Sequence, residues 1–357
     1  MTFSAPTPTH DAQAPSTTRQ IFGRASTMVT PWERGLLVLL AIVLAYFFIA
    51  NPFFGGQVLS LTEQFVATGI MAIGFVPVIL TGGIDLSVGP TASLTGAVMG
   101  SLWVGGTNIW LACVIALLIA FAVGLVNGLI VVYAHIQSLV ATLATMFILM
   151  SISTAVAGPN PPFGFPAAFT FLGVGQFGPV PVQLVVFIVI AIVAVLISTQ
   201  TVFGRSLLMI GLSPDAARYS GIRVNWHLIR AYIVCSLASG VAGLFLAAYY
   251  SATRRDLGDS LLLPALTMVV LGGVDIFGGR GRVFGVVIAV FVLGLLSRGL
   301  LSLGISQLTA NMIGALVLLL VIGLRGTVSG RALWRKIRGG IKPSRAPDGV
   351  DVSEVTQ

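Results

Sequence analysis

The sequence predicts an all-α, polytopic membrane protein with about ten transmembrane helices. The first observation behind this prediction is composition: 56% of the residues are hydrophobic, only 8% are charged, and the mean hydropathy is +1.01. A soluble domain carries about 25% charged residues. The second observation is that apolar runs of about 20 residues recur along nearly the whole chain, each long enough to cross a bilayer. These features exclude an ordinary cytosolic enzyme, a disordered protein and a secreted disulfide scaffold.

The apolar runs divide the chain into a central membrane domain and two tails. Residues 1–34 are polar and lack the apolar core of a signal peptide, so we expect a disordered cytoplasmic tail. Residues 35–325 form the transmembrane domain, and 326–357 a basic cytoplasmic tail. The predicted spans lie near 35–51, 60–80, 90–106, 109–134, 138–157, 181–203, 228–251, 263–279, 283–304 and 307–324. Two of these, 90–106 and 263–279, are short and glycine-rich, which favours tilted, broken or partly spanning helices.

The basic residues set the predicted orientation. Ten spans place both termini on one side, and if that side is the cytoplasm, 16 of the 19 Lys and Arg residues lie inside. The positive-inside rule therefore predicts N-in and C-in, with the loop 204–227 inside and the loop 158–180 outside. Because these residues cluster at the ends of spans, the net charge of +8 indicates membrane orientation and not a nucleic-acid partner.

No catalytic or metal site is expected in this chain. The three histidines are scattered, and neither metal-ligand spacing nor a Ser-His-Asp grouping is present. Neither Lys336 nor Lys342 follows the glycines of a phosphate-binding loop. Both cysteines, Cys113 and Cys235, lie in apolar runs and are interpreted as structural thiols.

The loop 204–227 contains the signals of a short capped helix. Ser213 is a favourable N-cap, Pro214 fits the first helical position, Asp215 complements the helix dipole, and Gly221 can end the helix. Such a helix on a basic loop can dock into a groove of a soluble partner. A solvated connector is the alternative.

Two similar segments place an aspartate after a pair of glycines at the end of an apolar run. They are TGGIDLSVG at 81–89, with Asp85, and LGGVDIFGG at 271–279, with Asp275. Six predicted spans separate them, so we expect both on the same side of the membrane. They match the repeated, broken helices found near transporter substrate paths, although a chance likeness stays open. Asp85 faces the path, or Asp85 or Ser87 caps the following helix, and the two interpretations are compatible.

Arg298 is the only basic residue deep inside a predicted span, since Arg230 lies at the cytoplasmic start of 228–251. It lies six residues before Gly304, roughly 9 Å below the outer boundary at about 1.5 Å per residue. Its long side chain either extends outward to the interface or faces the path and binds hydroxyls or an anionic group of the solute.

Several of these stretches carry a family resemblance. The chain resembles the membrane-spanning permease subunit of bacterial ABC importers of the ribose/xylose/rhamnose class. Its C-terminal sequence is similar to the autoinducer-2 and rhamnose branches. The matching blocks run in the family's order over about 36–325, and Pro90 replaces a usual small polar residue. The blocks are TGGIDLSVGPTASLTGAVMG at 81–100 and the segments at 124–146, 204–224 and 263–296.

The resemblance implies a type II ABC importer-like permease, multi-pass in the bacterial plasma (inner) membrane, that imports a sugar or sugar-like solute. It implies two ATP-binding cassette subunits, a second permease subunit (a copy or a paralogue) and an extracytoplasmic solute-binding protein as partners. This chain itself would hold no cofactor, since ATP and Mg are bound by the partner ATPase. The rivals are a branched-chain amino-acid-type ABC permease, disfavoured by the GGIDLSVG block, and an ion-coupled secondary transporter, disfavoured by the scarcity of carboxylates within spans.

Two groups of candidate site residues follow. The candidate substrate-pathway residues are Gly82, Gly83, Asp85, Ser87, Asn127, Thr142, Asp275 and Arg298. By resemblance to the helix that docks on the ATP-binding subunit, the candidate coupling residues are Gly204, Arg205, Gly211, Ser213, Ala216, Ala217, Arg218 and Gly221. Tyr219 departs from a more usual leucine in that loop.

Overall fold

The computed structural model describes residues 29–51, 53–310, 312–317 and 319, and these residues are almost entirely helical. The chain divides into two compact units, Met1–Leu295 and Leu296–Gln357, which are considered separately. The predicted C-terminal tail and most of the predicted N-terminal tail lie outside the described residues.

Among the described residues, six helices are long and apolar enough to cross a membrane, and each coincides with a predicted span. Helix α14 begins in the first unit and ends in the second. The six are α2 (Pro31–Ala50), α6 (Ile109–Tyr133), α7 (Ser138–Ala157), α9 (Val182–Gln200), α12 (Val224–Tyr250) and α14 (Val283–Ser302).

The remaining predicted spans are shorter helices. The span predicted near 60–80 consists of the 3-10 helix η1 (Ser60–Gln64) and α4 (Val66–Leu80), and the span near 90–106 is α5 (Val88–Val104). The last one, near 307–324, is helical at its described residues between 307 and 317 and belongs to the second unit.

The span predicted at 263–279 is a broken helix, as its glycines favoured, and its helical part is shorter than the predicted range. After the 3-10 helix η2 (Asp259–Leu261), helix α13 (Leu262–Leu271) has only ten residues. At about 1.5 Å per residue it measures about 15 Å, half the thickness of the hydrocarbon core. The glycine-rich segment 272–282 forms a turn instead of extending the helix. A total of ten spans therefore stays a prediction.

Helix α2 begins earlier than expected, inside the predicted tail. The Thr30 hydroxyl accepts from the Glu33 N–H, and the Glu33 carboxylate accepts from the Thr30 N–H, which together form a capping box, with Pro31 at the first position. The apolar run alone missed this start, because the capping residues are polar.

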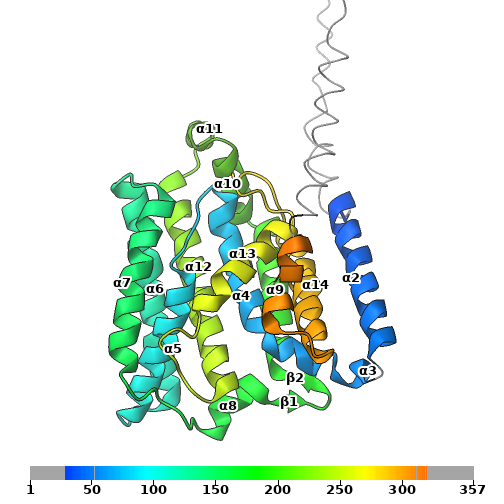
Figure 1. Cartoon of the computed structure of the whole chain (residues 1–357). Coiled ribbons are helices and arrows are strands. Elements are labelled where there is room, and N and C mark those ends of the chain that lie inside the picture. Colours follow the sequence, from blue (N-terminus) through cyan, green and yellow to red (C-terminus); the bar gives the residue numbers. More distant parts are fainter. Residues whose placement is uncertain (1–28, 52, 311, 318, 320–357) are drawn as a thin grey trace, which may run out of the picture. The chain divides into compact units, whose positions relative to one another are not determined.

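The connecting elements lie at two opposite ends of the first unit (Figure 1). Helices α10 (Val202–Leu212) and α11 (Pro214–Tyr219) occupy one end. At the other end lie α3 (Phe54–Gln57), α8 (Ala167–Val174) and the antiparallel pair β1 (Gln176–Phe177) and β2 (Val180–Pro181), in which Gln176 faces Pro181. The two long predicted loops are thus at opposite ends, as the predicted orientation requires.

Helix α12 is the centre of the first unit and packs against α4, α5, α6 and α8. Glycines allow its close approach to α6. A methyl group on Gly124 would lie 2.6 Å from the Tyr232 carbonyl oxygen, and one on Gly128 would lie 2.9 Å from the Ile229 Cα. Small residues four apart are a common way for membrane helices to bring their backbones together. This contact carries Asn127, which lies between the two glycines, into the interior, where it is fully buried.

Candidate functional site

The segment between α4 and α5, residues 81–87, is here called the first Gly–Asp turn. The chain leaves α4 after Leu80 and reverses at Gly82, whose φ of 78° suits glycine. Asp85 is fully buried, and its Oδ1 atom accepts two hydrogen bonds from Ser87, from the backbone N–H at 2.9 Å and from the hydroxyl at 2.6 Å. Asp85 therefore stabilises the turn itself.

One interpretation expected Asp85 or Ser87 to start the following helix. Ser87 does occupy the N-cap position of α5, but its side chain accepts no hydrogen bond from the first turn. The Ser87 hydroxyl donates to Asp85 instead.

A chain of buried polar groups continues from Asp85 to two neighbouring helices. The Asn127 side-chain amide on α6 donates to the Ser87 hydroxyl at 2.9 Å. The Thr145 hydroxyl on α7 in turn donates to the Asn127 side-chain oxygen at 2.7 Å. Asp85, Ser87 and Asn127 are all fully buried. Since buried polar groups are costly unless they are bonded, this network fixes the first Gly–Asp turn against α6 and α7.

Helix α7 also bonds the backbone of the first Gly–Asp turn. The Ile84 N–H donates to the Ser138 hydroxyl at 3.2 Å, and the Leu86 N–H donates to the Thr142 hydroxyl at 3.1 Å. The Thr142 hydroxyl itself donates to the carbonyl oxygens of Ile84 and Ser138, at 3.1 and 2.8 Å. The structure thus brings Thr142 together with Asp85, as the candidate list implied.

Sequence reasoning missed Ser138 and Thr145. With Thr142 they are spaced by four and three residues, so the three hydroxyls lie on one face of a helix, and this spacing was the available signal. Gly83 lies in the same region. A methyl group there would come 3.0 Å from the Tyr232 hydroxyl oxygen, which leaves no room for a side chain.

The segment 272–282, here called the second Gly–Asp turn, repeats the local geometry of the first. Asp275 Oδ1 accepts from the N–H of Phe277 two residues later, at 3.1 Å, as Asp85 does from Ser87. The two turns touch, because the Gly279 N–H donates to the Leu80 carbonyl oxygen at 2.8 Å. Among the described residues, the Asp275 carboxylate bonds only within its own turn, so the structure does not join Asp275 to the network around Asp85.

Helix α10 reaches the same point. A methyl group on Gly211 would lie 2.0 Å from the Leu80 carbonyl oxygen and 2.3 Å from the Gly279 nitrogen. Leu80, Gly211 and Gly279 therefore form a contact of three backbones, here called the three-backbone junction. Gly211 is the next-to-last residue of α10, so this junction lies just before α11.

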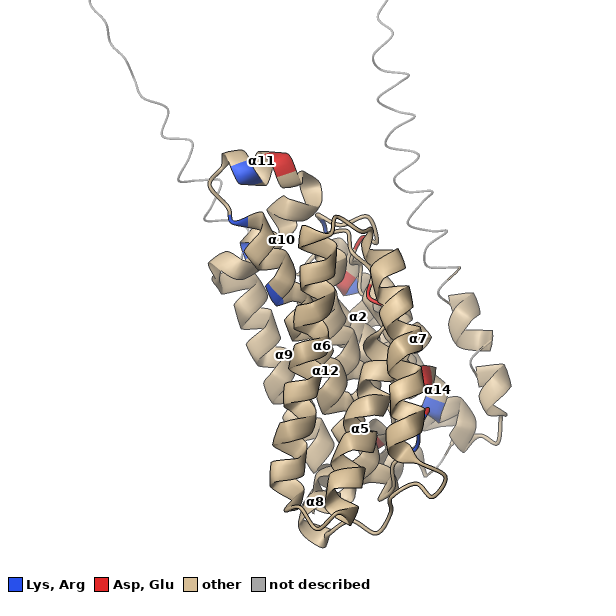
Figure 2. Cartoon of the chain, turned by 90° about the vertical axis from the view of Figure 1, so that its left-hand side faces the viewer, with Lys and Arg blue, Asp and Glu red and all other residues tan. Residues whose placement is uncertain are grey.

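Helix α11 confirms the predicted capped helix. The Ser213 hydroxyl accepts from the Ala216 N–H at 3.2 Å, and Pro214 occupies the first position. Asp215 and Arg218 pair at 3.0 Å, and Gly221 follows the helix with φ of 81°. Figure 2 shows several of the basic residues around α10 and α11.

The exposed face of α11 is smaller than the list of candidate coupling residues implied. Ala217 is buried at 1% exposure against Ile210 and Val224, so it is not a surface contact. Gly204 is also buried, because a methyl group there would lie 2.2 Å from the Ser198 carbonyl oxygen. Ala217 is buried because a six-residue helix that rests on α10 must bury one face. Gly204 and Gly211 belong to α10 and are part of its packing. The exposed candidates are Arg205, Ala216, Arg218 and Gly221, Ser213 is half-buried, and Tyr219 is 94% exposed.

Arg298 lies on the part of α14 that belongs to the second unit, and it is half-buried. Its role therefore stays a prediction. Among the described residues, no group of three His, Cys, Asp or Glu side chains could hold a metal ion.

An ion pair that sequence reasoning missed ties α2 to the second Gly–Asp turn. Glu33, exposed by only 2%, pairs with Arg282 at 3.3 Å. Beside it, the Trp32 indole N–H donates to the Leu271 carbonyl oxygen at 3.0 Å. The start of α2 thus braces the turn that forms part of the three-backbone junction.

Comparison with known proteins gives a family match over most of the chain. A family model described as "Branched-chain amino acid transport system / permease component" matches residues 57–322. The chain is also 37% identical over 302 residues to proteins called "Autoinducer 2 import system permease protein LsrD" in Escherichia coli O9:H4 (strain HS), Escherichia coli (strain K12) and Shigella flexneri. Each match covers 82% of this chain and 91% of the relative. No solved structure matches the chain.

Proposed function

The chain belongs to the family of branched-chain amino acid transport system permease components, and from this premise we propose that it forms half of the path for a sugar-like solute in an importer of the bacterial inner membrane. It is a permease of the ABC importer class and a non-catalytic subunit of such a transporter. The proposal adds the solute class, the partners, the membrane and the roles of individual residues.

The choice of a sugar-like solute rests on the relatives. The relatives, of which the match covers 91%, are named as permeases for autoinducer 2 import. The family description names branched-chain amino acids, so an amino acid is the second candidate. We favour a small hydroxylated solute because the identity of 37% extends over 82% of this chain and includes the region of the first Gly–Asp turn.

The proposed partners are two ATP-binding subunits, a second permease subunit and an external solute-binding protein. The ATP-binding subunit docks on the exposed face of α11, where Asp215, Ala216 and Tyr219 face solvent. The arginines of the loop support a cytoplasmic location for this end of the first unit, because basic residues favour the inner side of a membrane. The binding protein docks at the opposite end, which carries α8 and the β1–β2 hairpin.

One observation carries the proposed coupling mechanism: the three-backbone junction connects α11 to both Gly–Asp turns. A displacement of α11 by the ATP-binding subunit moves the end of α10 at Gly211. Because Gly211 packs directly on Leu80 and Gly279, no flexible side chain absorbs the movement. Packed elements transmit displacement because protein interiors are close-packed and resist compression.

The first Gly–Asp turn passes this displacement to the helices beside the proposed path. Asp85 and Ser87 link the turn to Asn127 of α6, while Thr142 bonds it to α7. The four side chains act as one polar joint that moves α5, α6 and α7 together. Asp85 thus positions helices and does not bind the solute directly while this conformation persists, since its carboxylate is fully buried.

The test is uptake by the reconstituted transporter. The full chain is purified with the permease, ATP-binding and solute-binding proteins encoded beside it, and proteoliposomes are offered labelled autoinducer 2, ribose or leucine with and without internal ATP. We expect ATP-dependent uptake of a sugar-like solute. Uptake of leucine alone would favour the amino-acid permease, and uptake driven by an ion gradient without ATP would overturn the proposal.

A further inference from the structure

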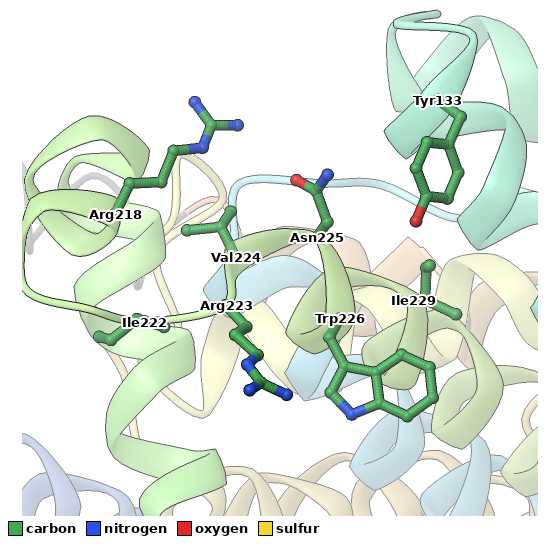
Figure 3. A pocket seen from close by; sticks show the side chains of 8 residues that line it. All are labelled: Tyr133, Arg218, Ile222, Arg223, Val224, Asn225, Trp226 and Ile229. Atoms are coloured by element: carbon green, nitrogen blue, oxygen red, sulfur yellow. The ribbon is translucent and has the colours of Figure 1, made fainter.

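A cleft of about 410 Å³ opens beside α11, where the end of α6 meets the start of α12. Tyr133 lines it from α6, Arg218 from α11, and Arg223, Asn225 and Trp226 from the beginning of α12 (Figure 3). Neither the pathway residues around Asp85 nor the three-backbone junction contributes to its wall. The cleft is therefore a separate feature of the first unit.

The wall of the cleft is positively charged. Arg218 and Arg223 line it, and Arg230 stacks over the Trp226 ring at 4.7 Å from the ring centroid. Arg218 is already paired with Asp215 at 3.0 Å, whereas, among the described residues, no carboxylate forms an ion pair with Arg223 or Arg230. Arg223 also immediately precedes α12, whose N-terminus has no side-chain cap and adds the positive end of a helix dipole. The charge of the cleft thus complements an anion.

The position of the cleft relative to the membrane surface indicates which kind of anion it binds. Tyr133 is 64% exposed at the end of α6, and Trp226 is 48% exposed in the first turn of α12. Both helices are long and apolar enough to cross a membrane, and exposed Tyr and Trp at the ends of such helices mark the headgroup region. Ile222 and Ile229 add apolar wall to the same cleft. A ligand that fits a basic cleft with an apolar wall at the level of the headgroups carries an anionic group next to an apolar part. A phospholipid has both.

We propose that this cleft binds the phosphate of an anionic phospholipid, of which phosphatidylglycerol is the simplest. Arg223 contacts the phosphate, Trp226, held by Arg230, lies against the glycerol and upper acyl region, and Arg218 and Asn225 add positive charge and a donor at the opposite edge of the cleft (Figure 3). Basic clefts between membrane helices bind lipid headgroups in this way. A lipid is favoured over a soluble partner because most of the lining comes from α6 and α12 and not from the outer face of α11. The proposal requires only that α6 and α12 lie in a membrane, so it stands or falls independently of the solute and of the coupling mechanism.

Native mass spectrometry of the full chain in detergent tests the site. The probes are phosphatidylglycerol, phosphatidylcholine with the same acyl chains, and inorganic phosphate. We expect the wild type to retain phosphatidylglycerol in preference to phosphatidylcholine. Arg223→Gln should weaken this retention about fivefold, because one basic residue near an anionic lipid contributes about 1 kcal/mol. Arg255→Gln is the matched control, since it removes an exposed arginine from the segment between α12 and η2, outside the cleft.

Each outcome decides the proposal. Trp226→Leu is a second variant that keeps every arginine but removes the ring under Arg230, and it should also weaken the preference for phosphatidylglycerol. Equal melting temperatures of all variants in phosphatidylcholine establish that they are folded. Equal retention of both lipids by the wild type, or an equal loss in Arg255→Gln, would overturn the proposal. If inorganic phosphate is retained as strongly as phosphatidylglycerol, the cleft is a phosphate site and the lipid proposal is wrong. Unchanged retention of phosphatidylglycerol in Arg223→Gln would also overturn the proposal.

Discussion

The Gly279 N–H donates a hydrogen bond of 2.8 Å to the carbonyl oxygen of Leu80, and this bond joins the second Gly–Asp turn to the end of α4, almost 200 residues earlier in the chain. Leu80 ends α4, which leads into the first Gly–Asp turn, and Gly279 lies in the second. Gly211 of α10 packs on both residues. The permease thus has a direct backbone connection from the proposed docking helix to its most buried polar groups.

Gly211→Ala should separate ATP hydrolysis from uptake. Its new methyl group would lie 2.0 Å from the Leu80 carbonyl oxygen, so the junction must open. Overpacking of this kind costs about 1–3 kcal/mol. We expect reduced uptake with the ATP-binding subunit still bound, measured in proteoliposomes at equal protein levels. Gly35→Ala is the control, because a methyl group on Gly35 meets no atom within 4 Å. Normal uptake by Gly211→Ala would remove the junction from the coupling mechanism.

Tyr219→Asp and Ala217→Asp should fail for different reasons. Tyr219 is 94% exposed, so its replacement should leave the melting temperature unchanged and weaken association with the ATP-binding subunit about tenfold or more. Ala217 is buried against Ile210 and Val224, so an aspartate there should lower the folded yield. Co-purification and thermal melts separate the two effects. If Tyr219→Asp binds the ATP-binding subunit as the wild type does, α11 is not the docking surface.

These two residues also show how far the sequence predicts the candidate site. The helix itself was predictable, since Ser213, Pro214 and Asp215 act on their immediate neighbours. Which side of the helix is buried was not, because alanine suits either side and the contacts of Ala217 come from other elements.

The same distinction applies to the rest of the fold. Six long helices follow from hydropathy alone, since length and composition decide whether a helix can cross a membrane. The glycines of 263–279 favour a broken helix, but the sequence does not show where the segment after Leu271 lies. Its position depends on the bond from Gly279 to Leu80 and on the ion pair between Glu33 and Arg282, both of which join distant parts of the chain.

Asp85→Asn should retain most transport, and Asp85→Leu should lose it. An asparagine oxygen can still accept from the Ser87 N–H and hydroxyl, whereas leucine removes both bonds. Hydrogen bonds to a charged group each contribute about 1.5–3 kcal/mol, so the Leu variant should also melt at a lower temperature. Uptake is compared at equal membrane levels. Wild-type transport by Asp85→Leu would exclude Asp85 from the polar joint.

Arg298→Gln should lower the apparent affinity for the solute while basal ATP hydrolysis and membrane levels persist. The reason is that its planar group of donors suits hydroxyls or an anionic group of a solute, and a neutral amide offers fewer donors. The measurement is uptake against solute concentration with the assembled transporter in lipid. Unchanged uptake would mean that Arg298 only extends toward the membrane interface, and would remove it from the candidate pathway residues.

The central claim is that α11 receives the ATP-binding subunit at the cytoplasmic end of this permease. Site-specific photo-cross-linking tests it most directly, with the cross-linker placed in turn at Tyr219, which is 94% exposed, and at Phe177 of β1, which is 59% exposed at the opposite end. We predict that the ATP-binding subunit is captured from position 219 and not from position 177, in intact membranes of cells that make all subunits. Capture from position 177, or no capture from position 219 while the complex still co-purifies, would contradict the account.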